Sequence, residues 1–432
     1  MSDQYKETYF YSLLSVSHVF IAAQPELILL VSVRNRSPLM KLLLENRTLG
    51  LVTLSQFIRV MGRSVAWIFT PLYLLIDYHD TYFQIGMIFF VSSLISLPVS
   101  IYGGNLIDRV GRRVVSIVSP VVSSALFFGL FLSSFIHLPA MIVYILFVLI
   151  YPFADLEGIA DNVMISDTVS PEQRNDAFSL ARISANVGFS MGPAIGGFIA
   201  LYGFGYTFFI PFVTSLAVAI IYLIKMAETR PASTSTTSKF SFPAKDREFI
   251  YFAIMVSMAW FIAGQWGTTL TLFLNRAYDY TSVQIGVLYS LNGIIVILFQ
   301  LPVNAALKRF TDVSKLSIGV LIYAVTFFTF SLTSYFPFVL LDTAILTIGE
   351  NAMAPASQTI IAKLAPESRR GEYFGAFGAV SGMIVPLAPL FGTLALGYLI
   401  STPILFWSIF LYLGLILSVV LKISGKISKR VD

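Results

Sequence analysis

The stretch Gly104-Asn-Leu-Ile-Asp108-Arg109-Val-Gly111-Arg112-Arg113 decides the fold, because it places charges between two long apolar runs of the chain. Gly104 and Gly111 predict tight turns, since glycine adopts backbone conformations that other residues avoid. Asp108 and the three arginines are too costly to place among lipid tails. We therefore expect a short surface connection between two membrane-spanning helices. Alternatively, these charges serve only to set the orientation of the helices in the membrane.

The composition is that of an integral membrane protein. Of the 432 residues, 56% are hydrophobic and 12% are charged, and the mean hydropathy is +0.81. The net charge of +5 is spread in small basic groups, which argues against a nucleic-acid-binding patch. The chain has no cysteine and three scattered histidines, so its sequence contains no disulfide and no thiolate or histidine metal cluster. We expect no metal and no cofactor.

Apolar segments of about 20 residues, the length that crosses ~30 Å of hydrocarbon, recur along the chain. We expect twelve membrane-spanning helices, near residues 49–76, 82–103, 114–136, 140–164, 177–201, 205–226, 249–274, 283–305, 315–335, 338–361, 373–399 and 403–423. They form an N-terminal bundle at 49–226 and a C-terminal bundle at 249–424, joined by a polar cytoplasmic linker at 227–248.

The two ends of the chain are expected to lie outside the spans. Polar residues interrupt the apolar stretch within 1–48, which we interpret as a cytoplasmic or interfacial extension that does not cross the membrane. A start of the protein at Met40 is an alternative. Residues 425–432 are expected to form a short cytoplasmic tail.

The basic residues decide the orientation. Nearly all of the 28 lysines and arginines lie in the termini and in alternate connections, while connections such as 77–81 and 137–139 are almost free of them. Basic connections stay on the cytoplasmic side of a membrane. We therefore expect a multi-pass protein of the cell membrane with both termini in the cytoplasm.

The two halves of the chain repeat. Thr81-Tyr-Phe-Gln84-Ile-Gly86 recurs as Thr281-Ser-Val-Gln284-Ile-Gly286, at an offset of 200 residues (281 minus 81). At the same offset the charged stretch is degraded, with Lys308 where Asp108 stands. A second echo pairs Pro171-Glu172-Gln-Arg174 with Pro366-Glu367-Ser-Arg369. Such echoes predict two similar six-helix units.

The pattern G-x-L-x-D-R-x-G-R-R, the twelve spans and the linker together resemble the major facilitator superfamily over about residues 49–424. The resemblance implies an all-α membrane protein whose two pseudo-symmetric bundles rock between inward-open and outward-open states around a central cavity. It also implies a cytoplasmic latch between the bundles, which loosens as the protein turns inward. The latch would consist of Gly104, Asp108, Arg109, Gly111, Arg112 and Arg113.

The fifth span carries a glycine-rich pattern. Its residues Gly188, Gly192, Pro193, Gly196 and Gly197 resemble the G-x-x-x-G-P-x-x-G-G pattern of the drug–proton antiporters of that family. Alternatively, small residues at every fourth position simply let membrane helices pack closely. In the fourth span, where many such antiporters carry an arginine, this chain has Ala154. The role of that arginine in proton coupling therefore does not carry over.

Polar residues inside the spans need a partner, a watery cavity or a function, since a charge near the bilayer centre costs at least ~2.5–3.5 kcal/mol. We expect a substrate cavity lined by Gln56, Arg59, Arg63, Trp67, Gln265, Trp266, Thr269, Asn351 and Gln358. The candidates for proton coupling are Asp155, Glu157 and Glu350. For Asp155 the alternative is a fixed ion pair with Arg59 that only holds two helices together.

These features predict a secondary transporter, with proton-coupled efflux of hydrophobic or cationic small molecules as the leading hypothesis. Its expected partners are the small-molecule substrate, protons and the lipid bilayer, without nucleic acid, and we expect a monomer. An alternative is a transporter of a metabolite or organic anion held by Arg59 and Arg63. A non-transporting receptor is a further alternative. We do not expect an enzyme, because the sequence contains no H-E-x-x-H, G-x-S-x-G or P-loop motif.

Overall fold

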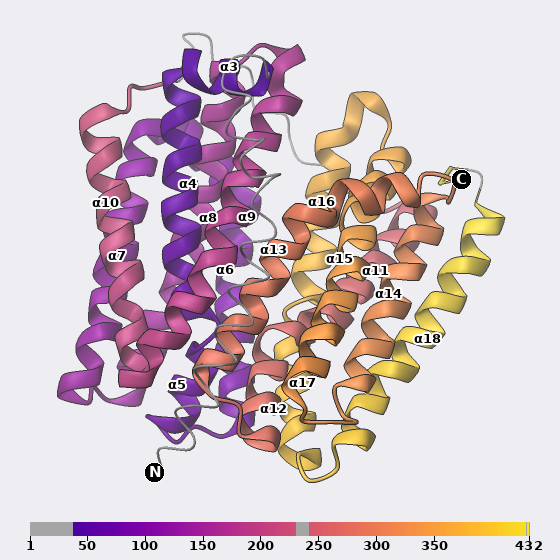
Figure 1. Cartoon of the computed structure of the whole chain (residues 1–432). Coiled ribbons are helices and arrows are strands. Elements are labelled where there is room, and N and C mark those ends of the chain that lie inside the picture. Colours follow the sequence, from indigo (N-terminus) through magenta and orange to yellow (C-terminus); the bar gives the residue numbers. More distant parts are fainter. Residues whose placement is uncertain (1–37, 230–241, 429, 432) are drawn as a thin grey trace.

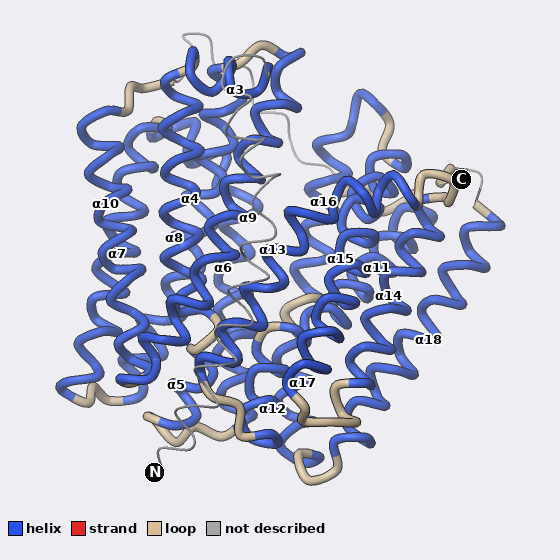
Figure 2. The backbone as a smooth tube through the Cα atoms, in the orientation of Figure 1, coloured by secondary structure: helices blue, strands red, loops and turns tan. Residues whose placement is uncertain are grey.

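The computed structural model describes residues 38–229, 242–428 and 430–431. Most of the expected extension at 1–48 and the middle of the linker at 227–248 lie outside the described residues. Within the described ranges all regular secondary structure is helical (Figure 2). A short helix, α3 (Pro38–Glu45), precedes the first span.

The N-terminal bundle contains six spans. They are α4 (Arg47–Trp67) continued by α5 (Thr70–Ile76), α6 (Tyr82–Val110), α7 (Arg112–Ile136), α8 (Ala140–Thr168), α9 (Arg174–Ile199) and α10 (Phe209–Lys225). Three 3-10 turns, Pro171–Gln173, Ala200–Tyr202 and Phe204–Phe208, lie at the ends of α9 and before α10.

The C-terminal bundle repeats this plan. Its spans are α11 (Arg247–Ala263) continued by α12 (Thr268–Tyr278), α13 (Ser282–Ala306), α14 (Asp312–Thr329), α15 (Phe336–Leu364), α16 (Arg370–Ile384) continued by α17 (Leu387–Leu399), and α18 (Pro403–Ile427). The 3-10 turns Gly264–Trp266 and Glu367–Arg369 join α11 to α12 and lead into α16.

Eleven helical segments in the described part of the chain are long and apolar enough to cross a membrane. The first span completes the set of twelve, although it contains Arg59 and Arg63 and is divided between α4 and α5. The prediction of twelve spans is therefore confirmed. The seventh span is divided at the corresponding place, between α11 and α12, so the break in the first span recurs in the second half.

The sequence echo at Thr81 and Thr281 has a structural cause. Each threonine caps the helix that follows: its hydroxyl accepts a hydrogen bond from the backbone N–H of Gln84 (3.2 Å) or Gln284 (3.3 Å). Each glutamine side chain in turn accepts from the backbone N–H of its threonine, at 2.8 Å and 3.0 Å. These reciprocal bonds satisfy N–H groups that a helix start leaves unpaired, which explains why the pattern occurs in both halves.

The charged stretch at 104–113 differs from its prediction at one position. The helix α6 continues through Gly104 to Val110, so Gly104 makes no turn. Only Gly111 interrupts the helices, with a φ of +104° that favours glycine. The turn predicted at Gly104 is wrong because the residues after it continue the helical hydrogen bonding, and Gly111 N–H still donates to the Ile107 carbonyl at 2.9 Å.

The two bundles stand side by side (Figure 1). One end of the molecule carries Gly111, the start of the linker and the described C-terminus; we call it the basic end. The helices α9 and α6 of the first bundle contact α13 and α17 of the second. A Cβ added at Gly86 would lie 2.8 Å from the Leu390 Cα, which shows how closely α6 and α17 approach near the opposite end.

Aromatic side chains gather in the core of the C-terminal bundle. In the C-terminal bundle Trp407 is fully buried, its ring stacked on Phe327 with centroids 5.1 Å apart. Phe273 meets the same indole edge-on at 5.3 Å. This aromatic core joins α12, α14 and α18.

Candidate substrate site and charge clusters

Four charged side chains form a closed cluster inside the N-terminal bundle. Arg59 of α4 pairs with Asp161 of α8, and its Nε lies 3.3 Å from Glu157 Oε2. Arg63, one turn further along α4, places Nη2 2.6 Å from the same Glu157 oxygen. Arg59, Glu157 and Asp161 are all less than 5% exposed. Two arginines thus face two carboxylates in a largely buried interface between α4 and α8.

Hydroxyl groups of neighbouring helices also bond the two carboxylates. Ser123 of α7 donates to Glu157 Oε1 at 2.8 Å, and Tyr222 of α10 donates to Asp161 Oδ1 at 2.8 Å. The charges cancel and each carboxylate has partners from several helices. A buried ion pair of this kind is strongly disturbed by removing one member, because the other charge is left without compensation. The cluster therefore joins four helices of this bundle.

The ion pair between Asp155 and Arg59 is not formed. Asp155 instead accepts hydrogen bonds from Ser96 and from Ser100 of α6, the latter at 3.1 Å. The reason is helical geometry: residues 157 and 161 are four apart and share the face toward α4, whereas residue 155 is turned about 200° from residue 157. Arg59 therefore pairs with Glu157 and Asp161 and not with Asp155.

An apolar cavity of about 290 Å³ lies within the N-terminal bundle. Its wall is mainly aromatic and aliphatic and includes Trp67, Phe147, Tyr151 and Phe189. Arg63 is its charged member, with a side chain 21% exposed. Ala154 also lines it, so the arginine that reaches this cavity comes from α4 and not from the fourth span.

A second, polar cavity of about 280 Å³ lies between the two bundles. The first bundle contributes Arg182 and Asn186 of α9. The second contributes polar residues of α13 and α15, together with Trp266; they are Asn292, Gln300, Glu350 and Asn351. Trp67 and Phe189 line both cavities, with ring centroids 6.4 Å apart. The apolar and polar cavities are therefore neighbours across this aromatic pair.

Glu350 has a different environment from the acids of the first bundle. Asn292 donates to Glu350 Oε2 at 2.9 Å and to the Thr347 hydroxyl at 2.9 Å. No basic side chain lies within ion-pair distance of Glu350 in the described ranges. Arg182 of the other bundle lines the same polar cavity.

Arg182 is the site residue that sequence reasoning missed. The preference of basic residues for the cytoplasmic side places it with the residues at that end of the fifth span, which set the orientation. The available signal was its position five residues inside the expected span at 177–201 (182 minus 177), more than one helical turn beyond a surface connection.

Four of the nine expected substrate-cavity residues line the two cavities: Arg63, Trp67, Trp266 and Asn351. The other five do not. Gln265 is fully buried and donates to the Ala388 carbonyl at 3.1 Å, while Thr269 donates to its side-chain oxygen at 2.8 Å. Arg59 lies in the charge cluster, Gln56 is half-buried, and Gln358 is exposed on α15.

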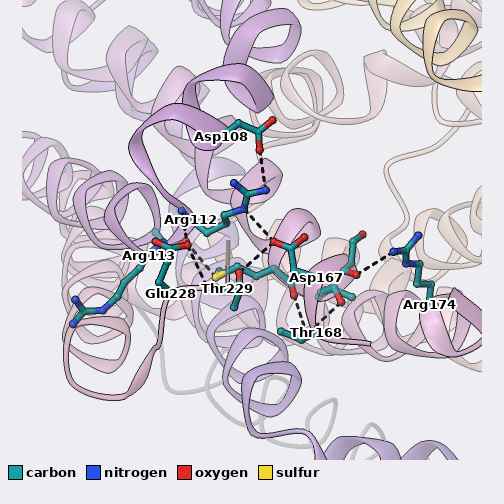
Figure 3. A network of polar contacts seen from close by, with 12 residues as sticks. Asp108, Arg112, Arg113, Asp167, Thr168, Arg174, Glu228 and Thr229 are labelled. Atoms are coloured by element: carbon teal, nitrogen blue, oxygen red, sulfur yellow. Dashed lines mark hydrogen bonds and ion pairs between the residues drawn. The ribbon is translucent and has the colours of Figure 1, made fainter. Parts of the chain in front are cut away.

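The charged stretch at the basic end contacts its own bundle (Figure 3). Asp108 pairs with Arg112 at 2.8 Å, and the Arg112 Nε lies 3.0 Å from Asp167 of α8. The Glu228 carboxylate, at the start of the linker, accepts the backbone N–H groups of Arg112 (3.1 Å) and Arg113 (3.2 Å). A carboxylate at a helix start is favoured by the helix dipole, so the linker caps α7. Arg109 is exposed.

The glycine pattern of α9 has two faces. Cβ atoms at Gly188, Gly192 and Gly196 would lie 2.7, 2.5 and 2.3 Å from backbone oxygens of α4, so this face packs inside the bundle. At Gly197 a Cβ would lie 2.6 Å from the Ser282 carbonyl oxygen of α13, and the Ser282 hydroxyl donates to the Gly197 carbonyl at 2.8 Å. The second face, with Pro193, therefore forms a close seam between the bundles.

Metal binding finds no support in the described part of the chain, where no three histidine, aspartate or glutamate side chains gather in a way that could hold an ion.

Comparison with known proteins points to one family. The model of the Major Facilitator Superfamily matches residues 52–311 and 254–425. A Na(+), Li(+), K(+)/H(+) antiporter of Planococcus maritimus is 23% identical, over 70% of this chain and 80% of its own length. Multidrug resistance protein 1 of Bacillus subtilis (strain 168) is 22% identical, over 88% of this chain and 97% of its own.

Solved structures show the same fold. A mutant of the nucleoside transporter NupG superposes with a TM-score of 0.73 at 14% identity, covering 87% of this chain and 99% of that one. The family model spans both bundles, the described helices are long and apolar enough to cross a membrane, and the relatives are transporters. The chain therefore belongs to the Major Facilitator Superfamily and is an integral, multi-pass membrane transporter of small molecules.

Proposed function

We propose that this transporter couples the efflux of hydrophobic or cationic small molecules to protons, by alternating access of the polar cavity to the two sides of the membrane. The observation that carries the proposal is Glu350, a carboxylate without an ion-pair partner in the described ranges, on the wall of a cavity between the bundles. A carboxylate at membrane depth needs a proton or a cation. Substrate and proton can therefore compete for it.

The surroundings of Glu350 support a substrate with an apolar body. The adjoining apolar cavity offers aromatic walls, and Trp67 and Trp266 border the polar cavity, where indole faces attract cations. The names of two relatives, a multidrug resistance protein and a cation–proton antiporter, agree with this substrate class and with proton coupling.

Of the three acids considered for proton coupling, Glu350 is the one we propose. Glu157 is held by Arg59, Arg63 and Ser123, and Asp155 by two serines of α6. The alternative of an anion held by Arg59 and Arg63 is disfavoured by the same contacts, because both guanidinium groups are already neutralised by carboxylates.

The test is proton movement in proteoliposomes containing a pH-sensitive dye. In the wild type, tetraphenylphosphonium, a lipophilic cation, should drive proton movement. Glu350→Gln should abolish substrate-driven proton movement, while exchange of labelled for unlabelled substrate persists. Asp155→Asn, whose side chain is held by two serines of α6, is the control and should retain coupling. Full proton coupling in Glu350→Gln would contradict the proposal.

We also propose that both termini are cytoplasmic and that this conformation is inward-open. The basic residues favour the cytoplasm at the basic end. The close contacts between bundles at Gly86 and Gly197 lie toward the opposite end, and Asp108 contacts its own bundle, as expected for a loosened latch.

Asp108→Asn tests the latch. Asp108 is half exposed, so its pair with Arg112 contributes about 0.2–1 kcal/mol and the fold should survive. The transport rate should fall at least fivefold, with substrate affinity unchanged. Transport rates and equilibrium binding measured on the same preparation separate the two effects. An unchanged transport rate would leave Asp108 with a role in orientation alone.

A further inference from the structure

Two opposite charges face the polar cavity from opposite bundles. Arg182 belongs to α9 and Glu350 to α15, and both line the same space of about 280 Å³. In the described ranges the Arg182 side chain has no hydrogen bond and no ion pair, and it is exposed toward open space. The two side chains line one cavity without forming an ion pair in the described ranges. Either charge alone is costly at this depth.

The amide of Asn351 is the second observation. This side chain is 1% exposed and lines the polar cavity, yet neither its Oδ1 nor its Nδ2 has a hydrogen-bond partner. A buried polar group without a partner costs about 1–3 kcal/mol. The cavity therefore presents a donor and an acceptor that a bound molecule can satisfy.

From this arrangement we propose that the preferred substrates are zwitterions with an apolar body. The ammonium group lies at Glu350, the carboxylate or a similar acid at Arg182, and a polar group of the substrate pairs with Asn351. The apolar body passes Trp67 and Phe189 into the neighbouring apolar cavity. This inference rests on the proposed function, which it narrows to one class of substrate.

A zwitterion satisfies the site better than either single charge. A simple cation at Glu350 leaves Arg182 unpaired, and a simple anion at Arg182 leaves Glu350 unpaired. A molecule with both charges neutralises both side chains at once with charge-assisted hydrogen bonds. Because the two side chains belong to different bundles, the same molecule links the bundles and favours their approach at the basic end.

Three ligands with one phenyl body test the proposal on the purified full-length protein: phenylalanine, phenethylamine and 3-phenylpropionate, as zwitterion, cation and anion. Their naphthyl counterparts form a second trio with a larger apolar body. Isothermal titration calorimetry gives the dissociation constants. In the wild type the zwitterion of at least one trio should bind tenfold or more tightly than its amine and its acid.

The variants assign the two charges. Arg182→Gln should lower the affinity for the zwitterion tenfold or more, to that of the amine, and should leave the affinity for the amine unchanged. Glu350→Gln should remove the preference for the zwitterion over the acid. Arg276→Gln, in the last turn of α12 and outside the polar cavity, is the control and should change neither.

The outcomes separate this inference from the proposed function. Equal binding of zwitterion and amine, or an Arg182→Gln variant with unchanged preference, overturns the zwitterion assignment. So does the absence of binding by all six ligands while tetraphenylphosphonium still drives protons; proton-coupled cation efflux then stands. If Glu350→Gln leaves proton movement intact, the proposed function itself fails.

Discussion

The two bundles hold intramembrane charge in different ways. In the first bundle Arg59, Arg63, Glu157 and Asp161 neutralise each other, and hydroxyls of neighbouring helices complete the cluster. In the second, Glu350 is held by an amide and faces a cavity whose only basic wall residue in the described ranges, Arg182, belongs to the other bundle. A closed set of charges stabilises a bundle, whereas an open charge is available to a proton or ligand.

The largest effect should come from opening the closed cluster. Asp161→Asn leaves the buried charges unbalanced, with one more arginine than carboxylate, and should lower the free energy of unfolding by about 3–5 kcal/mol. Glu350→Gln removes a charge but keeps a group that Asn292 can bond, so its effect should stay below about 1 kcal/mol. Denaturation of both variants in detergent measures the difference.

If Asp161→Asn and Glu350→Gln lowered the free energy of unfolding equally, the two bundles would not differ in how they hold charge. A matched control is Asp155→Asn, which alters an acid of the same helix as Asp161 but outside the cluster. Asp155→Asn should lower the free energy of unfolding less than Asp161→Asn does, since two serine hydroxyls can still bond the amide, and more than Glu350→Gln does.

The next effect concerns the seam where the bundles meet. A Cβ at Gly197 would lie 2.6 Å from the Ser282 carbonyl, so Gly197→Val should force α9 and α13 apart and shift the protein away from this conformation. Transport should fall tenfold or more. Because the chain has no cysteine, spin labels on introduced cysteines at Val110 and Lys308 report the separation of the bundles at the basic end.

The distance between those labels should shorten in Gly197→Val as the contacts near the opposite end open. Gly378→Val, at a helical glycine of α16 where an added Cβ meets open space, is the control and should leave the distance unchanged. An unchanged distance in Gly197→Val would mean that this seam does not set the relative position of the bundles.

The smallest effect sharpens the comparison at the basic end, where the C-terminal tail ties the second bundle. Arg430 pairs with Asp246 at 2.9 Å, and this bond, with those from the Phe249 N–H and the Tyr373 hydroxyl, lowers the pKa of Asp246 from 3.8 to about 2. A depressed folded-state pKa stabilises the protein above pH 3.8, and this stabilisation is lost as the pH falls toward 2.

Arg430→Gln should therefore lower the unfolding temperature by about 1–2 °C at pH 6, since the pair is partly exposed. The difference from the wild type should shrink as the pH falls below 3.8, where Asp246 takes up protons. Thermal unfolding between pH 6 and pH 3 measures it. Arg309→Gln, whose side chain lies over the Phe310 ring, should show no such pH dependence.

Much of the architecture follows from local rules. Apolar length predicts the spans, and the threonine–glutamine caps of α6 and α13 are visible as a repeat because a helix start needs the same donors and acceptors wherever it occurs. The spacing of Glu157 and Asp161 likewise places them on one face of α8. The turn predicted at Gly104 failed because helical hydrogen bonding there outweighs the freedom of glycine.

The sequence by itself determined the membrane class, the twelve spans, the repeat and which polar residues share a helix face, because these depend on hydropathy and helical period. Only the tertiary structure decided that Arg59 meets Asp161 and not Asp155, and that Arg182 faces the cavity of Glu350. The rotation of each helix about its own axis, and the contact of one bundle with the other, depend on packing between residues far apart in the chain.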